Sequence, residues 1–244
     1  FMVFGSGAAQ EMHRRWFESH LDKFNLSYSN RSDEYHGLSI AGPNSRKVLE
    51  KIVRDDVSNE KFKFRDSRRM FVGGVPAIIN RISFTGELGY EIYVAPHYQL
   101  KLYEELMEAG KEFNIKPFGG RALMSMRLEK NWGAWTLDYR PDFTAKETGL
   151  DAFINWDKEF IGKESAQKEN SSNKLVPLIV ETNEIDVTNN EAVLNGDQSI
   201  GYVTSGGFAH FVNKSVAFTF VDQKNIKSEN KIQVEINGDL FNCS

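Results

Sequence analysis

Cysteine is almost absent from this chain, which has a single Cys243 in 244 residues. A lone thiol cannot form an internal disulfide, so a disulfide-stabilised secreted scaffold is excluded and a reducing, cytoplasmic location is favoured. No apolar run approaches the roughly 18 residues of a transmembrane helix. The N-terminal residues do not have the pattern of a signal peptide. We therefore expect a cytoplasmic protein without a membrane partner.

Positive charge is also not in excess. Thirty Lys and Arg residues face 34 Asp and Glu residues, a net charge of −4, which argues against nucleic acid as a partner. The five histidines have no metal-ligand spacing with cysteine or carboxylates, so no metal site is expected. No serine lies in a G-x-S-x-G elbow. Gly5-Ser6-Gly7 lacks the third glycine of a dinucleotide loop, since Gln10 stands there, and we interpret it as an ordinary turn.

The periodicity predicts an α+β fold in two parts. Hydrophobic residues make up 40% of the chain and aromatic residues 12%, enough for a packed core. Helices are expected at Ala8–Leu21, from Pro43, at Tyr98–Phe113 and at Gly119–Lys130. Strands are expected at Phe1–Phe4, His36–Ile40, in a hairpin over residues 70–84, and at Glu91–Val94.

A polar segment, Lys168–Lys174, separates this region from one that contains short strands alone. These are Leu175–Val180, Ile200–Thr204, Ser215–Val221 and Lys231–Ile236, with turns expected at Asn195-Gly196, Gly206-Gly207 and Asn237-Gly238. The pattern is typical of a small β-barrel or sandwich. We predict domains at residues 1–168 and 174–244.

The segment from Phe84 to Val94 is the strongest local signal. Gly86 and Gly89 predict a tight turn, and the residues that follow alternate with a period of two. Glu91 then lies inside an apolar strand, either on a wet face or paired with a specific partner; the pattern leaves both possibilities open. Glu87 is interpreted as a turn carboxylate.

Two arginines and two tryptophans follow in the Gly119–Lys130 region. Arg121 is in the first turn of the predicted helix, where the dipole disfavours a cation. A partner such as Glu91, an anionic ligand or a structural ion pair would each explain it, whereas Arg127 is predicted to be structural. Trp132 and Trp135 flank a pair of small residues, which suits either a wall for a planar ligand or core packing.

Five motifs together resemble the glycine-cleavage T-protein (aminomethyltransferase) family. They are residues 84–91, FTGELGYE; residues 121–130, RALMSMRLEK; residues 147–150, ETGL; residues 160–164, FIGKE; and residues 201–207, GYVTSGG. Residues 11–17, EMHRRWF, and 127–133, RLEKNWG, are most similar to the folate-binding C-terminal half of dimethylglycine and sarcosine dehydrogenases. The resemblance implies α/β folate-binding subdomains followed by a small C-terminal β-barrel.

The resemblance also implies a function. Such enzymes oxidise an N-methyl amine with FAD, and the iminium product reacts with tetrahydrofolate to give 5,10-methylenetetrahydrofolate. Glu91 would accept hydrogen bonds from the pterin edge, Arg121 would lie near the ligand, and Tyr90, Trp132 or Trp135 would stack on its rings. The catalytic aspartate of the family would precede residue 1, as would the FAD domain. We therefore expect an N-terminally truncated fragment, inactive by itself, whose C-terminus also lacks residues.

Other assignments remain. A stand-alone aminomethyltransferase or a dimethylsulfoniopropionate demethylase of the same family would lack an upstream FAD segment. A non-catalytic, folate-binding branch linked to iron–sulfur assembly carries a K-G-C-Y-x-G-Q-E segment. This chain has Tyr139-Arg140-Pro141-Asp142 in that region and no internal cysteine. A purely structural module would bind no folate.

Overall fold

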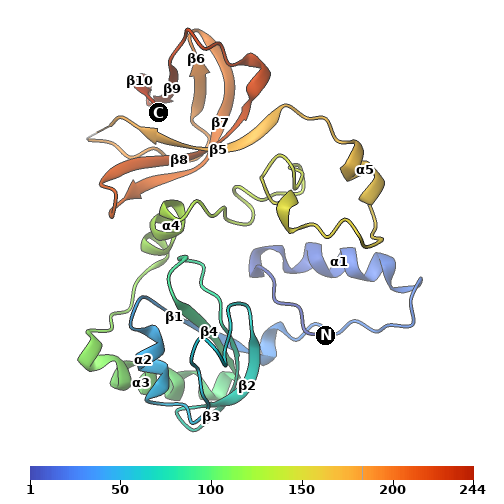
Figure 1. The fold of residues 1–244 in the computed structure, drawn as a ribbon, viewed down its shortest axis with the longest axis vertical. Helices are drawn as coiled ribbons and strands as arrows, with labels where there is room; N and C mark the ends of the chain where they lie inside the picture. Colours follow the sequence, from blue (N-terminus) through green and yellow to red (C-terminus); the bar gives the residue numbers. More distant parts are fainter. Residues whose placement is uncertain (183) are drawn as a thin grey trace. The chain divides into compact units, whose positions relative to one another are not determined.

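The computed structural model describes residues 1–182 and 184–244 (Figure 1). The chain forms two compact units, Phe1–Leu123 and Met124–Ser244. Helices and antiparallel strands occur in both, so the predicted α+β class is confirmed. The domain limits predicted at residues 168 and 174 describe a different division and stay a prediction. No helix among the described residues is long and apolar enough to cross a membrane.

The first unit contains a sheet with the strand order β1-β4-β3-β2, antiparallel throughout. Its strands are β1 (His36–Ala41), β2 (Ser67–Val72), β3 (Val75–Asn80) and β4 (Gly89–Val94). Its helices are α1 (Gln10–Leu21), α2 (Ser45–Glu50) and α3 (Gln99–Gly110), with short 3-10 turns at Gly7–Ala9, Ser32–Glu34, Pro96–Tyr98 and Lys111–Phe113. The predicted helices and the hairpin over β2 and β3 are confirmed.

One face of this sheet forms the core with α2 and α3. Tyr90, Ile92 and Val94 are fully buried there, together with Leu49 of α2 and Leu102 of α3. The period of two in β4 therefore does what the sequence predicted, because it turns alternate side chains to opposite faces. In contrast, α1 contributes no buried side chain.

Three local expectations in this unit are wrong. Residues 1–4 form no strand, because no described segment pairs with them. Gly86 is the turn residue, with φ +73°, but Gly89 belongs to β4. A Cβ on Gly89 would come within 2.7 Å of the Ile40 carbonyl oxygen, so close strand approach, not a turn, requires that glycine. Pro43 precedes the N-cap residue of α2, Asn44, instead of lying in its first turn.

The second unit is built around a sheet with the order β10-β9-β6-β7-β8-β5. Its strands are β5 (Asn173–Val180), β6 (Ala192–Asn195), β7 (Gln198–Ala209), β8 (Lys214–Asp222), β9 (Ile232–Ile236) and β10 (Asp239–Asn242). Two helices, α4 (Gly120–Glu129, beginning at the end of the first unit) and α5 (Lys163–Lys168), precede it, and 3-10 turns lie at Asp151–Phe153 and Gln223–Asn225.

The predicted barrel is closed by backbone hydrogen bonds between the last residues and β5. Ile179 and Ser244 exchange two bonds of 2.8 and 3.0 Å, and Glu181 donates to the Asn242 carbonyl at 2.9 Å. The two edge strands of the sheet are thereby joined through the chain end, which removes an exposed edge. The core inside contains Val180, Val203 and Val234, among others.

Two of the three predicted turns in this unit are confirmed. Asn195-Gly196 joins β6 to β7, and Asn237-Gly238 joins β9 to β10 with positive φ at both residues. The turn predicted at Gly206-Gly207 is wrong, because both residues lie inside β7. A Cβ on Gly206 would meet the Val187 carbonyl oxygen at 2.6 Å, so this glycine permits close backbone packing. Strands β6 and β10 were not predicted, since each has only four residues.

Candidate functional site

Glu91 lies on the face of the first sheet that the helices do not cover. Its neighbours in register are Ser39 on β1 and Asn80 on β3. The side chain is half-buried, and its Oε2 accepts a hydrogen bond of 2.7 Å from the Tyr93 hydroxyl. No described residue donates to Oε1. Glu91 is thus a carboxylate held by one partner, with acceptor capacity left for a ligand.

Tyr93 is packed tightly in its place. A Cβ on Gly37, its neighbour on β1, would lie 2.9 Å from the tyrosine ring, and the Phe4 ring centroid is 4.6 Å from that of Tyr93. Burial, and then the hydrogen bond to the Glu91 carboxylate, raise the pKa of Tyr93 well above its ordinary value. The hydroxyl therefore keeps its proton and remains a donor to Glu91. The alternation in the sequence places Glu91 and Tyr93 on the same face of the strand, but it did not predict the hydrogen bond between them.

Tyr90 has a different environment from the one that a stacking role requires. It is fully buried, its ring is stacked on that of Phe62 at 5.8 Å, and its hydroxyl oxygen accepts a 3.1 Å hydrogen bond from Arg46 Nε. This tyrosine packs in the core of the first unit, where it has no exposed ring face for a ligand. The stacking role that the resemblance implied for Tyr90 does not fit this burial.

Arg121 is exposed in the first turn of α4. It forms no ion pair with a described carboxylate of the first unit, to which it belongs. A structural ion pair within the first unit therefore does not explain its position. Its predicted role near an anionic ligand stays a prediction.

Arg127 of α4 is fully buried and structural, as predicted. Its Nη1 donates to Asp138 Oδ2 at 2.6 Å and to the Trp132 carbonyl at 3.1 Å. The Asp138 carboxylate also accepts from Ala134 N at 2.7 Å and from the hydroxyls of Thr204 and Ser205. Burial lowers the pKa of Arg127, and Asp138 opposes that shift. The network ties the loop after α4 to β7.

That loop carries both tryptophans. Trp132 is 42% exposed and borders a cavity of about 210 Å³ within the second unit; the other lining residues are Asn131, Tyr139, Thr148, Gly149, Leu150, Phe153, Leu175, Pro177 and Phe218. Its indole is perpendicular to the rings of Tyr139 and Phe153. Trp135 is half-buried and forms an isolated backbone bridge with Tyr139. Trp132 has the placement of a ligand wall; the folate roles of both tryptophans stay predictions.

Two of the sequence motifs have structural explanations. Glu147 is buried and accepts hydrogen bonds from Ser171 Oγ at 2.5 Å and Thr144 N at 2.9 Å. These bonds fix the segment that leads into β5.

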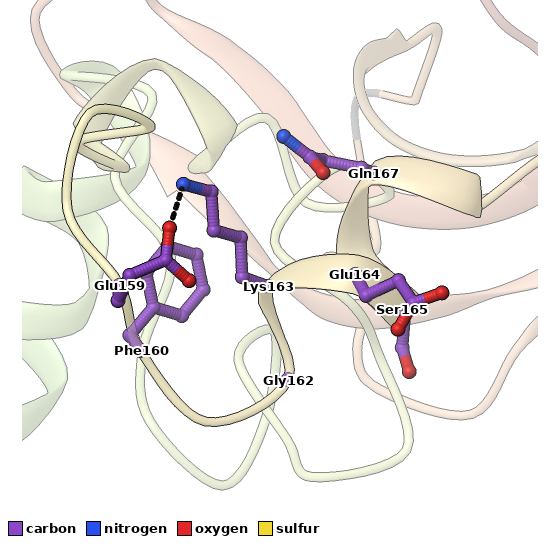
Figure 2. A pocket seen from close by; sticks show the side chains of 7 residues that line it. All are labelled: Glu159, Phe160, Gly162, Lys163, Glu164, Ser165 and Gln167. Carbon is purple, nitrogen blue, oxygen red and sulfur yellow. Dashed lines mark hydrogen bonds and ion pairs between the residues drawn. The ribbon is translucent and has the colours of Figure 1, made fainter.

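Gly162 has φ +90° at the N-cap of α5. It borders a wide hollow of about 580 Å³ lined by residues of the 159–167 segment, in which Lys163 points to Glu159 at 2.8 Å (Figure 2). None of the predicted site residues lines this hollow.

No group of three or more metal-ligating side chains occurs in the part of the chain that the structure describes. The chemistry available at Glu91 is hydrogen-bond acceptance by a held carboxylate. Such a group suits a planar ligand that presents adjacent N–H donors.

Comparison with known proteins defines the family. Residues 1–158 match the model of the GCVT N-terminal domain, and residues 173–244 match that of the glycine cleavage T-protein C-terminal barrel domain. The chain belongs to the glycine-cleavage T-protein (aminomethyltransferase) family. The aminomethyltransferase T of the glycine cleavage system from Bartonella henselae has the same fold, with a TM-score of 0.81 at 21% identity over 98% of this chain and 65% of that one.

Two curated relatives differ in length and name. Human mitochondrial dimethylglycine dehydrogenase is 34% identical over 96% of this chain. The aminomethyltransferase of Thermoanaerobacter pseudethanolicus is 30% identical over 97% of it. The chain spans 28% of the length of the first relative and 65% of the second. These relatives therefore show the family of the chain, and the activity of the whole protein is proposed below.

Proposed function

We propose that this chain is the tetrahydrofolate-binding part of an oxidative demethylase that resembles dimethylglycine dehydrogenase. Glu91 carries the proposal. Its carboxylate accepts hydrogen bonds from the amino group and the adjacent ring N–H of the pterin, while Tyr93 holds the carboxylate in place. Bonds to an ionised acceptor are shorter and stronger than neutral ones.

The position of Glu91 supports this role. A half-buried carboxylate inside an apolar strand needs partners, and the structure supplies one, Tyr93, while Oε1 has none among the described residues. The relatives support the reaction class, since their names include an aminomethyltransferase and a dimethylglycine dehydrogenase. The substrate would be an N-methyl amine. Its iminium carbon passes to tetrahydrofolate, which gives 5,10-methylenetetrahydrofolate, the demethylated amine and a proton.

FAD would accept the two electrons of amine oxidation, and in this proposal residues outside 1–244 bind it. The residues present do not fit a dinucleotide: Gly5-Ser6-Gly7 follows no strand and leads into a 3-10 turn. Within this chain the contribution to catalysis is to hold folate in a fixed orientation toward the iminium, and such positioning lowers the entropic barrier. The chain alone would bind folate without turning over an amine. The cytoplasmic location is also a proposal, resting on the single cysteine.

Calorimetric titration of the 244-residue chain with tetrahydrofolate tests the role of Glu91. We expect Glu91→Ala to weaken binding by about 1–3 kcal/mol, the scale for a lost charged hydrogen-bond partner. Glu235→Ala is the matched control, because Glu235 is an exposed strand glutamate in the second unit. Unchanged affinity in the Glu91 variant, or equal losses in both variants, would refute the proposal.

A stand-alone aminomethyltransferase is the second candidate, supported by relatives with that name that are 30–34% identical. Flavin absorbance of the purified full-length parent separates the two candidates. A bound flavin supports the demethylase, and a colourless, folate-binding parent supports the aminomethyltransferase.

A further inference from the structure

Asn80 stands beside Glu91 on the same face of the sheet. The two residues are directly opposite each other on β3 and β4, and directly opposite residues of an antiparallel pair have Cβ atoms about 4.5–5.5 Å apart. Both side chains are half-buried. Asn80 is therefore within reach of any ligand that Glu91 binds edge-on.

The Asn80 amide has no partner in the part of the chain that the structure describes. Its Oδ1 is buried without a hydrogen bond, and no described residue bonds to its Nδ2. A buried polar atom without a partner destabilises the folded chain. The two N–H donors of Nδ2, which no described residue uses, remain available to a ligand.

The two side chains together present a defined pattern. An ionised glutamate is an acceptor only, whereas an asparagine amide nitrogen carries two donors. Since Oδ1 is the buried atom of Asn80, Nδ2 is the atom that remains for a ligand. The complementary edge has N–H groups followed by a carbonyl oxygen, as in a 2-amino-4-oxo heterocycle. A 2,4-diamino ring presents a donor where this pattern requires an acceptor.

We propose that Asn80 is a specificity-determining residue, whose Nδ2 donates to the ring carbonyl adjacent to the N–H groups that Glu91 binds. The inference rests on the proposed function, because Glu91 must anchor the ligand. It assigns Asn80 the task of selecting 4-oxo over 4-amino heterocycles.

Folic acid and aminopterin test this selection, since they differ in the oxo or amino group at that position and in the neighbouring N3–H, which the oxo ring alone carries; comparison with the Asn80 variants isolates the part due to Asn80. Calorimetric affinities of the 244-residue chain are measured at about pH 8, where carboxylates are ionised. We expect Asn80→Leu to weaken folic acid binding roughly three- to tenfold, the effect of one hydrogen bond, with a smaller change for aminopterin. Asn80→Asp, an acceptor only, should reduce the preference for folic acid over aminopterin. Asn170→Leu and Asn170→Asp, at an exposed asparagine, leave it unchanged.

The stability of the ligand-free variants separates this role from a structural one. We expect Asn80→Leu to unfold at a denaturant concentration equal to or above that of the parent, because the substitution removes an unsatisfied buried amide. A lower midpoint would show that Asn80 supports the fold, and would overturn the inference.

The outcomes also distinguish the two proposals. If Glu91→Ala leaves the affinity for both ligands unchanged, or if the parent chain binds neither, the proposed function fails and the Asn80 inference fails with it. If Glu91→Ala weakens both ligands while the Asn80 variants keep the parent's preference, only the inference about Asn80 is overturned.

Discussion

The buried ion pair between Arg127 and Asp138 gives the sharpest stability prediction. Both side chains are completely buried. Asp138→Asn removes the charge that compensates the guanidinium, and it places an amide donor where the carboxylate accepted four hydrogen bonds. Arg127 would then be a buried cation without a counter-ion, and two of its nitrogens, Nε and Nη2, already have no hydrogen-bond partner among the described residues.

The cost follows from this geometry. Removing one partner of a buried pair typically costs about 3–5 kcal/mol, a large share of the roughly 5–15 kcal/mol that stabilises a domain. With a urea m-value near 3 kcal/mol/M, the unfolding midpoint should fall by about 1 M or more. Replacing both residues by apolar ones, Arg127→Met with Asp138→Leu, should recover only part of the cost of Asp138→Asn. No unpaired charge remains, but Ala134 N and the Thr204 and Ser205 hydroxyls lose their acceptor.

Urea unfolding followed by circular dichroism is the assay. Asp142→Asn provides the control, since Asp142 forms an exposed ion pair with Arg140 at 2.8 Å, and such a pair is worth about 1 kcal/mol or less. A loss below about 1 kcal/mol for Asp138→Asn would refute the reasoning. The reasoning would also be refuted if the loss of stability in the Arg127→Met/Asp138→Leu double variant equalled the sum of the losses in Arg127→Met and Asp138→Leu alone, since paired residues should couple.

Three further predictions concern stability and reactivity. Burial alone would raise the pKa of Glu147, but hydrogen bonds from Ser171 and Thr144 outweigh it and lower the pKa. The ionised Glu147 therefore stabilises the folded chain above the unfolded pKa of about 4.5, and this contribution is lost as pH falls through the folded pKa. Glu147→Gln should accordingly flatten the acid side of a plot of unfolding midpoint against pH. Burial raises the pKa of Cys243 to about 11, so at about pH 8 a thiol reagent should label it roughly a hundredfold more slowly than after denaturation; equal rates would contradict this. Gly201→Ala should cost about 2 kcal/mol or more in urea unfolding, because its Cβ would lie 2.0 Å from the Phe220 carbonyl oxygen, whereas Gly207→Ala, with 3.6 Å to its nearest neighbour, should cost less than about 1 kcal/mol.

The local periodicity of the sequence predicted most helices and strands of the fold. The alternation in β4 predicted which side chains enter the core, because side-chain direction in a strand depends only on the parity of the position. The Asn-Gly pairs predicted their hairpins for an equally local reason, the tolerance of positive φ. The turn predicted at Gly206-Gly207 was wrong because Gly206 permits a close approach by Val187, a residue nineteen positions away that no local pattern reveals.

The candidate site divides in the same way. Glu91 and Tyr93 are two residues apart in one strand, so the alternation in the sequence predicted their shared face. Asp138 finds Arg127 eleven residues away and Thr204 at a separation of 66, and tertiary folding alone decides such a network.

Asn80 shows what the pairing register of the strands adds to the sequence pattern. Nothing in residues 75–80 marks it, and a shift of the β3–β4 pairing by one residue would turn it to the helix-covered face. The register that places Ile79 against Ile92 in the core also places Asn80 against Glu91. Core packing therefore fixes both the acceptor and the donor of the candidate ligand edge. A variant that loosens the core on the helix side should then weaken ligand selection before it abolishes binding, because selection requires both side chains in register, whereas Glu91 alone still accepts hydrogen bonds from the ligand.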